Sequence, residues 1–213
     1  MLQVLRESAE GGRAIAAGWE RATYLFGASA NIVTGAQGMS LPVGSSVSVF
    51  AYGSNMLTAR IRERAPSARA VAIGHLTGYQ LCWNKRSRLD GSGKCSVSET
   101  GQQAHVVWGV VFEMGVENKP NLDRAEGLGQ GYGERVVKVN TEGGQLAVTM
   151  YYATSISPGI RPYDWYRELV VGGAREHRLP EEYVRTLETV EVMKDSDEDR
   201  AAINRRLLVR GLG

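Results

Sequence analysis

The chain reads Tyr52-Gly53-Ser54-Asn55 directly after a short apolar run, 47–51, and directly before a helical pattern that begins near Met56. Where a strand turns into a helix, several backbone N–H groups have no intrahelical partner. Glycine lets the backbone approach a ligand closely, and Ser and Asn are favoured N-cap residues. The segment therefore predicts a strand–turn–helix junction that either is simply capped or binds a carboxylate, a phosphate or a developing oxyanion.

The overall composition is that of an ordinary globular protein with one core, since 43% of the 213 residues are hydrophobic and 23% are charged. A formal net charge of +2 is too small to indicate nucleic-acid binding. No apolar stretch is long enough to cross a bilayer, and the N-terminus lacks the basic start and unbroken apolar region of a secretory signal. We expect a cytoplasmic protein with a small-molecule ligand and neither a nucleic-acid nor a membrane partner, and a homodimer is left open.

The residues that usually bind metals are dispersed. Cys82 and Cys95 lie in separate segments without a CxxC motif, and the three histidines are scattered along the chain. This spacing is not that of a zinc site, so we expect no metal ion.

The first part of the chain differs in character from the rest. Its apolar residues at helical spacing suggest one amphipathic helix: Ile15, Trp19, Ala22 and Phe26. The stretch 27–46 is rich in Gly, Ser and Ala, as a linker would be. We therefore divide the chain into an N-terminal extension, 1–45, and a domain, 46–213. Because Met39 precedes the domain closely, residues 1–38 are either a dispensable extension or a misassigned start.

The remaining pattern alternates strand and helix signals. Strands are expected at 47–52, at 106–112 with both faces buried, and at 132–139 and 146–153 as a hairpin. The run 70–83, which contains Gly74 and Gly78, predicts one bent or bulged strand. Helices are expected at 57–64, at 118–126 and over much of 158–213. We interpret 194–200 as the solvated start of the last helix.

Several ordered motifs resemble those of the γ-glutamylcyclotransferase family over 47–190. They are Phe50-Ala51-Tyr52-Gly53-Ser54-Asn55-Met56, Arg64-Ala65-Pro66-Ser67, Val107-Trp108-Gly109-Val110-Val111-Phe112, Leu122-Asp123-Arg124-Ala125-Glu126-Gly127 and Gly173-Ala174-Arg175-Glu176-His177-Arg178-Leu179-Pro180. The resemblance implies an α+β fold, a small mixed β-barrel with peripheral helices. It also implies an enzyme that cyclises γ-glutamyl amino acids or peptides to 5-oxoproline and releases the free amino acid or amine, without metal or cofactor.

The resemblance assigns roles to particular residues. Glu126 matches the glutamate that acts as general base and then as general acid, and burial near Leu122 and Leu128 would suit it to carry a proton near neutral pH. The backbone N–H groups of Tyr52, Gly53, Ser54 and Asn55 are implied to hold the γ-glutamyl group.

For other side chains a role in the site is one of several interpretations. Asp123 lies on the same helical face as Glu126, either as a second carboxylate of the site or in a local ion pair. Tyr132 is expected to hydrogen-bond the substrate or to pack as an ordinary strand residue, and Tyr152 is a further candidate for lining the site. The basic and aromatic patch of Trp83, Lys85, Arg86 and Arg88 is either a polar hairpin loop or a determinant of the leaving amino acid.

Two alternatives stay open. One is the same chemistry on a biosynthetic or carrier-linked γ-glutamyl intermediate, and the other is a non-catalytic small-molecule binding module on the same fold. A hydrolase with Ser54 as nucleophile is disfavoured because no histidine is placed to activate it and the G-x-S-x-G pattern is absent. A nucleotide P-loop is disfavoured because Gly53-Ser54-Asn55-Met56 lacks the Gly-Lys-Ser/Thr ending.

Overall fold

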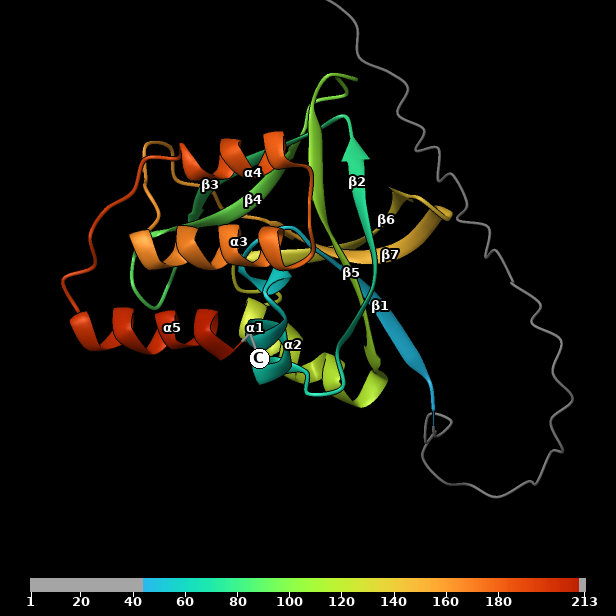
Figure 1. Ribbon diagram of the computed structural model, residues 1–213, viewed down its shortest axis with the longest axis horizontal. Helices are drawn as coiled ribbons and strands as arrows, with labels where there is room; N and C mark the ends of the chain where they lie inside the picture. The colour runs from blue at the N-terminus through green and yellow to red at the C-terminus, as the bar shows by residue number, and fades with distance from the viewer. Residues whose placement is uncertain (1–43, 211–213) are drawn as a thin grey trace, which may run out of the picture. The chain divides into compact units, whose positions relative to one another are not determined.

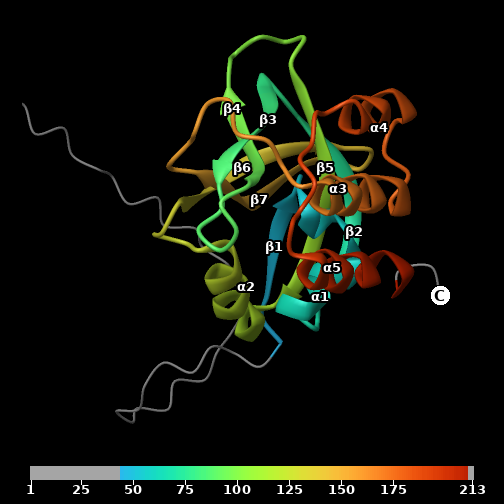
Figure 2. The same ribbon diagram turned by 90° about the vertical axis from the view of Figure 1, so that its left-hand side faces the viewer.

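The computed structural model describes residues 44–210, and within them five strands form a closed barrel in the order β1-β5-β2-β6-β7 (Figures 1 and 2). These strands are β1 (Ser46–Ala51), β2 (Arg69–Thr77), β5 (Val106–Gly115), β6 (Tyr132–Thr141) and β7 (Gly144–Ala153). Neighbouring strands are antiparallel except β1 and β7, which pair in parallel through Val49 and Phe50 and so close the barrel. The expected mixed barrel is confirmed.

The helices pack outside this barrel. They are η1 (Ser54–Met56), α1 (Thr58–Arg64), η2 (Val116–Asn118), α2 (Lys119–Glu126), α3 (Asp164–Glu176), α4 (Glu181–Glu188) and α5 (Glu198–Arg210). Figure 1 shows α3 between α4 and α5, and it contacts both. Helices α1 and α2 contact each other as well, and Figures 1 and 2 place both near the same end of the barrel.

Strand β5 lies at the centre of the core. It pairs with β1 on one side and with β2 on the other, and Val107, Val110, Val111 and Phe112 are fully buried. A strand with neighbours on both sides and cover on both faces needs apolar residues at consecutive positions. The expectation of a central strand at 106–112 is therefore confirmed, as is the hairpin of β6 and β7.

The run 70–83 forms two strands, where the sequence predicted one. Gly78 has a φ of +84°, a conformation that L side chains rarely adopt, and it ends β2 before β3 (Tyr79–Arg86) begins. Strand β3 then leaves the barrel and pairs with β4 (Gly93–Glu99) in a separate two-stranded sheet. The predicted bulge does occur, in β2 between Ala70 and Ala72.

The segment 194–200 is not simply a solvated helix start. Asp195 is only 1% exposed and accepts hydrogen bonds from Trp165 Nε1 and Arg200 Nε, both at 2.7 Å. The bonds from Arg200 lower the pKa of Asp195 to about 2. This buried carboxylate ties the start of α5 to α3, a long-range contact that the local charge pattern does not reveal.

Gly173 allows α3 to approach the turn that follows β1. A Cβ atom at this position would lie 2.3 Å from the backbone nitrogen of Leu57 and 2.6 Å from the carbonyl carbon of Met56. Because backbone atoms cannot move aside as a side-chain tip can, Gly173→Ala should displace α3. Overpacking of this kind lowers the free energy of unfolding by about 1–3 kcal/mol, and urea denaturation should show a lower midpoint.

Gly172→Ala is the matched control for that variant. There the added Cβ would meet the Cδ2 atom of Leu208 at 2.5 Å and the Cδ1 atom of Leu57 at 3.8 Å, and both atoms are ends of flexible side chains. Alanine is favoured over glycine within a helix by roughly 1 kcal/mol, so this variant should lose no stability. Equal midpoints for the two variants would contradict the close approach of α3 through Gly173.

The expected helix at 15–26, the linker and Met39 lie outside the described residues. Within 44–210 no helix has the length and apolar character required to span a membrane.

Candidate active site

The turn after β1 lies at the edge of a cavity. In the turn, the carbonyls of Gly53 and Ser54 accept hydrogen bonds from the N–H groups of Met56 and Leu57. The first N–H groups of such a turn have no partner within it. Four residues of the turn, Tyr52, Gly53, Ser54 and Asn55, line one small cavity.

Asn55 does not cap the following helix. The first helical residue of α1 is Thr58, preceded by Leu57, and no side chain caps it by a hydrogen bond. Instead the Asn55 Nδ2 atom donates to Glu126 Oε1 at 2.6 Å. The capping role that the residue types favoured is thus replaced by a contact with the predicted catalytic carboxylate.

Glu126 is the last residue of α2 and lines the same cavity as the turn. Gly127, in the left-handed conformation with φ +73°, ends the helix there. Arg64 Nη1 donates to Glu126 Oε1 at 2.7 Å and to Asn55 Oδ1, also at 2.7 Å. The structure therefore brings Glu126 to the turn, as predicted, within a three-residue network.

The surroundings of Glu126 differ from the apolar pocket that was expected. Its side chain is 15% exposed, and the guanidinium of Arg64 is its ion-pair partner. Both protein bonds reach Oε1, and among the described residues no hydrogen bond to Oε2 is found.

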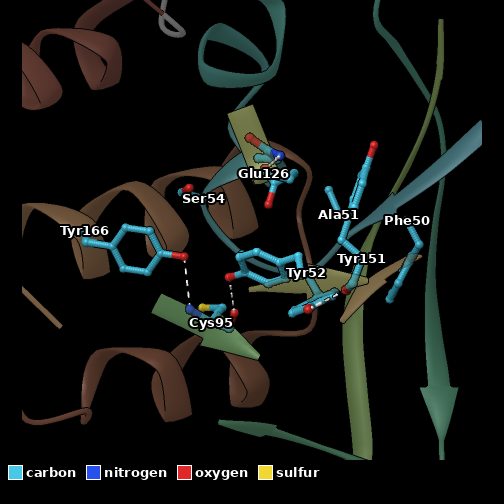
Figure 3. Close-up of a pocket in the computed structure, with 11 residues that line it drawn as sticks. Phe50, Ala51, Tyr52, Ser54, Cys95, Glu126, Tyr151 and Tyr166 are labelled. Atoms are coloured by element: carbon cyan, nitrogen blue, oxygen red, sulfur yellow. Dashed lines mark hydrogen bonds between the residues drawn. The ribbon is translucent and has the colours of Figure 1, made fainter. Parts of the chain in front are cut away.

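Cys95 lines the inner cavity, and its backbone binds two of the tyrosines that line it as well. Tyr132 donates its hydroxyl to the Cys95 carbonyl at 2.8 Å, and the Cys95 N–H donates to the hydroxyl oxygen of Tyr166 at 3.1 Å. Figure 3 shows Cys95 and Tyr166 joined in this way, with Glu126 on the other side of the drawn residues. The Tyr166 hydroxyl therefore accepts from the backbone and also has the Cys95 side chain as a hydrogen-bond partner. Burial raises the pKa of Tyr166 well above its ordinary value, so the phenol stays protonated.

The Cys95 side chain is unsuited to nucleophilic attack. Burial raises the pKa of its thiol to about 12. Since the thiolate is the reactive form of cysteine, this residue is a neutral thiol at neutral pH. Its contribution is the backbone that holds the two tyrosines.

A second cavity adjoins the first. The inner cavity has a volume of about 40 Å³, and the outer one has a volume of about 490 Å³. Ser54, Glu126, Tyr132 and Tyr166 line both. The predicted carboxylate therefore lies where a narrow, turn-lined space meets a wide one of the size that ligands occupy.

Among the tyrosines named from the sequence, Tyr132 lines the cavity and Tyr152 does not. Tyr152 packs beside Arg135, whose guanidinium carbon lies 5.3 Å from its ring centre. Its neighbour Tyr151 lines the cavity instead, and Tyr52 donates to the Tyr151 carbonyl at 2.7 Å. Neighbouring strand residues face opposite sides, so only one of the two side chains can point inward.

Of the other side chains named from the sequence, some line a cavity and some do not. Asp123 does not line either cavity, and its Oδ1 atom accepts from Lys119 Nζ and from the Tyr151 hydroxyl, each at 2.5 Å. It belongs to an ion pair, as one of the two interpretations held. In the basic patch, Lys85 and Arg88 line the outer cavity and Arg86 is exposed outside it. Trp83 meets the Tyr166 ring edge-on, with centroids 6.0 Å apart.

Sequence reasoning missed four residues of the site: Arg64, Cys95, Tyr151 and Tyr166. Arg64 belongs to one of the family motifs, and its position one helical turn after Arg60 was the available signal. Cys95 and Tyr166 meet from segments 71 residues apart, a pairing without a local signature. Within the described part of the chain, no group of three or more His, Cys, Asp or Glu residues is arranged to hold a metal ion.

Comparison with known proteins gives concordant results. The model of the AIG2-like family matches residues 106–187. The γ-glutamylcyclotransferase of Bos taurus is 33% identical over 153 residues, which cover 70% of this chain and 80% of the relative. That of Homo sapiens is 32% identical over 166 residues, which cover 74% and 86%. A solved structure described as γ-glutamyl cyclotransferase is similar with a TM-score of 0.68 and 30% identity, over 76% of this chain and 99% of the other.

Proposed function

The chain belongs to the γ-glutamylcyclotransferase family, and we propose that it cyclises γ-glutamyl amino acids or peptides with Glu126 as the proton carrier and the 52–55 turn as the cradle of the γ-glutamyl group. The domain 46–213 is proposed as the catalytic unit. The family model, which matches residues 106–187 within this domain, is consistent with this division.

The proposed reaction is an intramolecular acyl transfer. The substrate α-amine attacks the γ-carbonyl carbon, a C–N bond forms, and a tetrahedral intermediate carries the former carbonyl oxygen as an oxyanion. The bond from that carbon to the leaving nitrogen then breaks, which gives 5-oxoproline and the free amino acid or amine. Because both reacting groups belong to one molecule, much of the acceleration comes from holding the substrate in a ring-like conformation.

Glu126 would move the proton that this exchange requires. The ion pair with Arg64 at 2.7 Å and the hydrogen bond from Asn55 at 2.6 Å hold the side chain in place for this transfer. It takes a proton from the attacking nitrogen and returns it to the leaving nitrogen. Oε1 is held by Asn55 and Arg64, so Oε2 is the oxygen that we assign to proton transfer.

The oxyanion would be stabilised by the first N–H groups of the turn and by the Tyr166 phenol. Donors that are fixed before the reaction stabilise developing charge without reorganisation, and this is often the largest contribution to catalysis. The Cys95 N–H fixes the Tyr166 oxygen at 3.1 Å. The proposed steps use protein groups alone, without a metal ion or a cofactor.

One contact carries the proposal: the 2.6 Å hydrogen bond from Asn55 to Glu126, which joins the turn to the carboxylate. Incubation of the full chain with γ-glutamyl-alanine should release 5-oxoproline and alanine in equal amounts, quantified by chromatography. Saturable binding of γ-glutamyl compounds without any 5-oxoproline would identify a binding module instead.

A further inference from the structure

The outer cavity carries a strong excess of positive charge. Seven Lys and Arg side chains line it, against the two carboxylates of Asp90 and Glu126. The whole chain has a formal net charge of only +2. The excess is therefore concentrated at this cavity, which adjoins the site of proton transfer.

Four of these cations have no carboxylate partner within salt-bridge distance among residues 44–210. Arg64, Lys94 and Arg200 pair with Glu126, Asp90 and Asp195. In contrast, the remaining four cations contact neutral groups. Lys85 lies over the ring of Tyr132, and Arg88 donates to Gln130. Arg60 donates to Asn204, and Arg124 donates to Asn121.

Two of the four are held inside the protein. Lys85 is 7% exposed, with its Nζ atom 4.7 Å from the centre of the Tyr132 ring. Burial lowers the pKa of Lys85, and it lowers that of Arg60 to about 10, so Arg60 remains charged at neutral pH. The Nε atom of Arg60 is buried without a hydrogen-bond partner. Burying a cation without a carboxylate in contact with it is costly, which points to a ligand that supplies the negative charge.

The geometry also indicates which part of a substrate enters this space. Ser54, Glu126 and Tyr132 lie on the boundary of the two cavities. If the γ-glutamyl group occupies the inner cavity, the bond to be broken lies at that boundary and the leaving part extends outward. Lys85, whose Nζ atom lies 4.7 Å from the centre of the Tyr132 ring, is then a cation without a carboxylate partner close to the leaving part.

We propose that the outer cavity selects an acidic leaving group, so that the preferred substrates are γ-glutamyl amino acids or peptides whose leaving part carries a second carboxylate beyond its α-carboxylate. This inference rests on the proposed function, and it names the substrate class of the same site. The chemistry is unchanged: the amide C–N bond breaks, the leaving nitrogen gains a proton from Glu126, and an acidic amino acid or peptide is released.

A matched substrate pair tests the proposal. γ-Glutamyl-glutamate and γ-glutamyl-glutamine have nearly the same shape and differ in the charge of the leaving side chain. We expect kcat/KM of the full chain to be at least about tenfold higher for γ-glutamyl-glutamate, the worth of one charge-assisted contact, and the preference to fall with added NaCl. Lys85→Gln and Arg88→Gln should each move the ratio toward one.

Arg86→Gln is the control variant. It removes the same charge from the residue next to Lys85, but Arg86 is exposed and does not line the cavity, so the ratio should stay at its wild-type value. Equal kcat/KM values for the two dipeptides would overturn the inference and leave the proposed function intact.

A binding measurement distinguishes failure of the acidic preference from failure of the proposed reaction. Calorimetric titration of Glu126→Gln should give tighter binding of γ-glutamyl-glutamate than of γ-glutamyl-glutamine, independently of turnover. Equal affinities would overturn the acidic preference. Absence of turnover by the wild-type chain for every γ-glutamyl compound, with the affinity difference retained, would overturn the proposed reaction and support the charge selectivity of the cavity.

Discussion

Replacing Glu126 by Gln should lower kcat for γ-glutamyl-alanine by about 10²–10⁴-fold, the usual contribution of a positioned acid–base group. Glutamine has nearly the same shape, and its carbonyl oxygen can still accept from Asn55 and Arg64, which now contact Oε1 at 2.6 and 2.7 Å. The fold should therefore persist while the proton carrier is lost. Steady-state assays of 5-oxoproline release, with a urea denaturation curve for each protein, measure the two effects separately.

Glu134→Gln is the matched control for this variant. Glu134 lies on β6, outside both cavities, and pairs with Lys119 at the surface. The same loss of charge there should leave kcat within a few-fold of wild type, because exposed ion pairs contribute little. If Glu126→Gln retained wild-type kcat, or if both variants lost activity alike, Glu126 would not be the proton carrier.

Replacing Gly53 by Val should also cause a large loss, about 10²–10³-fold in kcat/KM, comparable to removal of one oxyanion donor. A Cβ atom at this position would lie 3.0 Å from the Cys95 Cβ atom and 3.3 Å from the Tyr166 hydroxyl. The added methyl groups would displace the wall that positions Tyr166 and would enter a cavity of only about 40 Å³. Overpacking should cost about 1–3 kcal/mol of stability, so activity suffers more than folding.

Gly143→Val provides the comparison for Gly53→Val. Its Cβ atom would meet only Thr141 Oγ1, at 3.9 Å, in the turn between β6 and β7, which is the end of the hairpin opposite to Tyr132. This variant should keep kcat/KM near the wild-type value. Full activity of Gly53→Val would contradict a role of the turn in holding the substrate.

Much of the fold could be read from local patterns. The apolar run of β5, the turn signals between β6 and β7, and the strand–turn–helix at 46–64 all depend on neighbouring residues, and the structure contains each of them. The division of 70–83 at Gly78 could not be read, since the glycine conformation that ends β2 is a property of the folded turn. Strand β4 was missed because it begins within the polar, glycine-containing stretch 90–93, which is typical of a loop.

The site was predictable only in part, for a related reason. Tyr52, Gly53, Ser54 and Asn55 are consecutive, and motif resemblance pointed to Glu126 and Tyr132; all six line the inner cavity. The residues that complete the site depend on long-range packing, as when Arg64 meets Glu126 across 62 positions of sequence. Choosing between Tyr151 and Tyr152 requires knowing which face of β7 points inward. Two adjacent tyrosines do not show this, because a register shift of one residue would exchange the two faces.

The most direct test of proton transfer by Glu126 is to follow binding and product formation in one sample of Glu126→Gln. Calorimetry with γ-glutamyl-alanine gives the Kd, and chromatography of the same mixture gives the 5-oxoproline released. We predict a Kd within a few-fold of the wild-type KM and a yield of 5-oxoproline at least about a hundredfold below wild type. Retained binding together with wild-type production of 5-oxoproline would contradict the assignment.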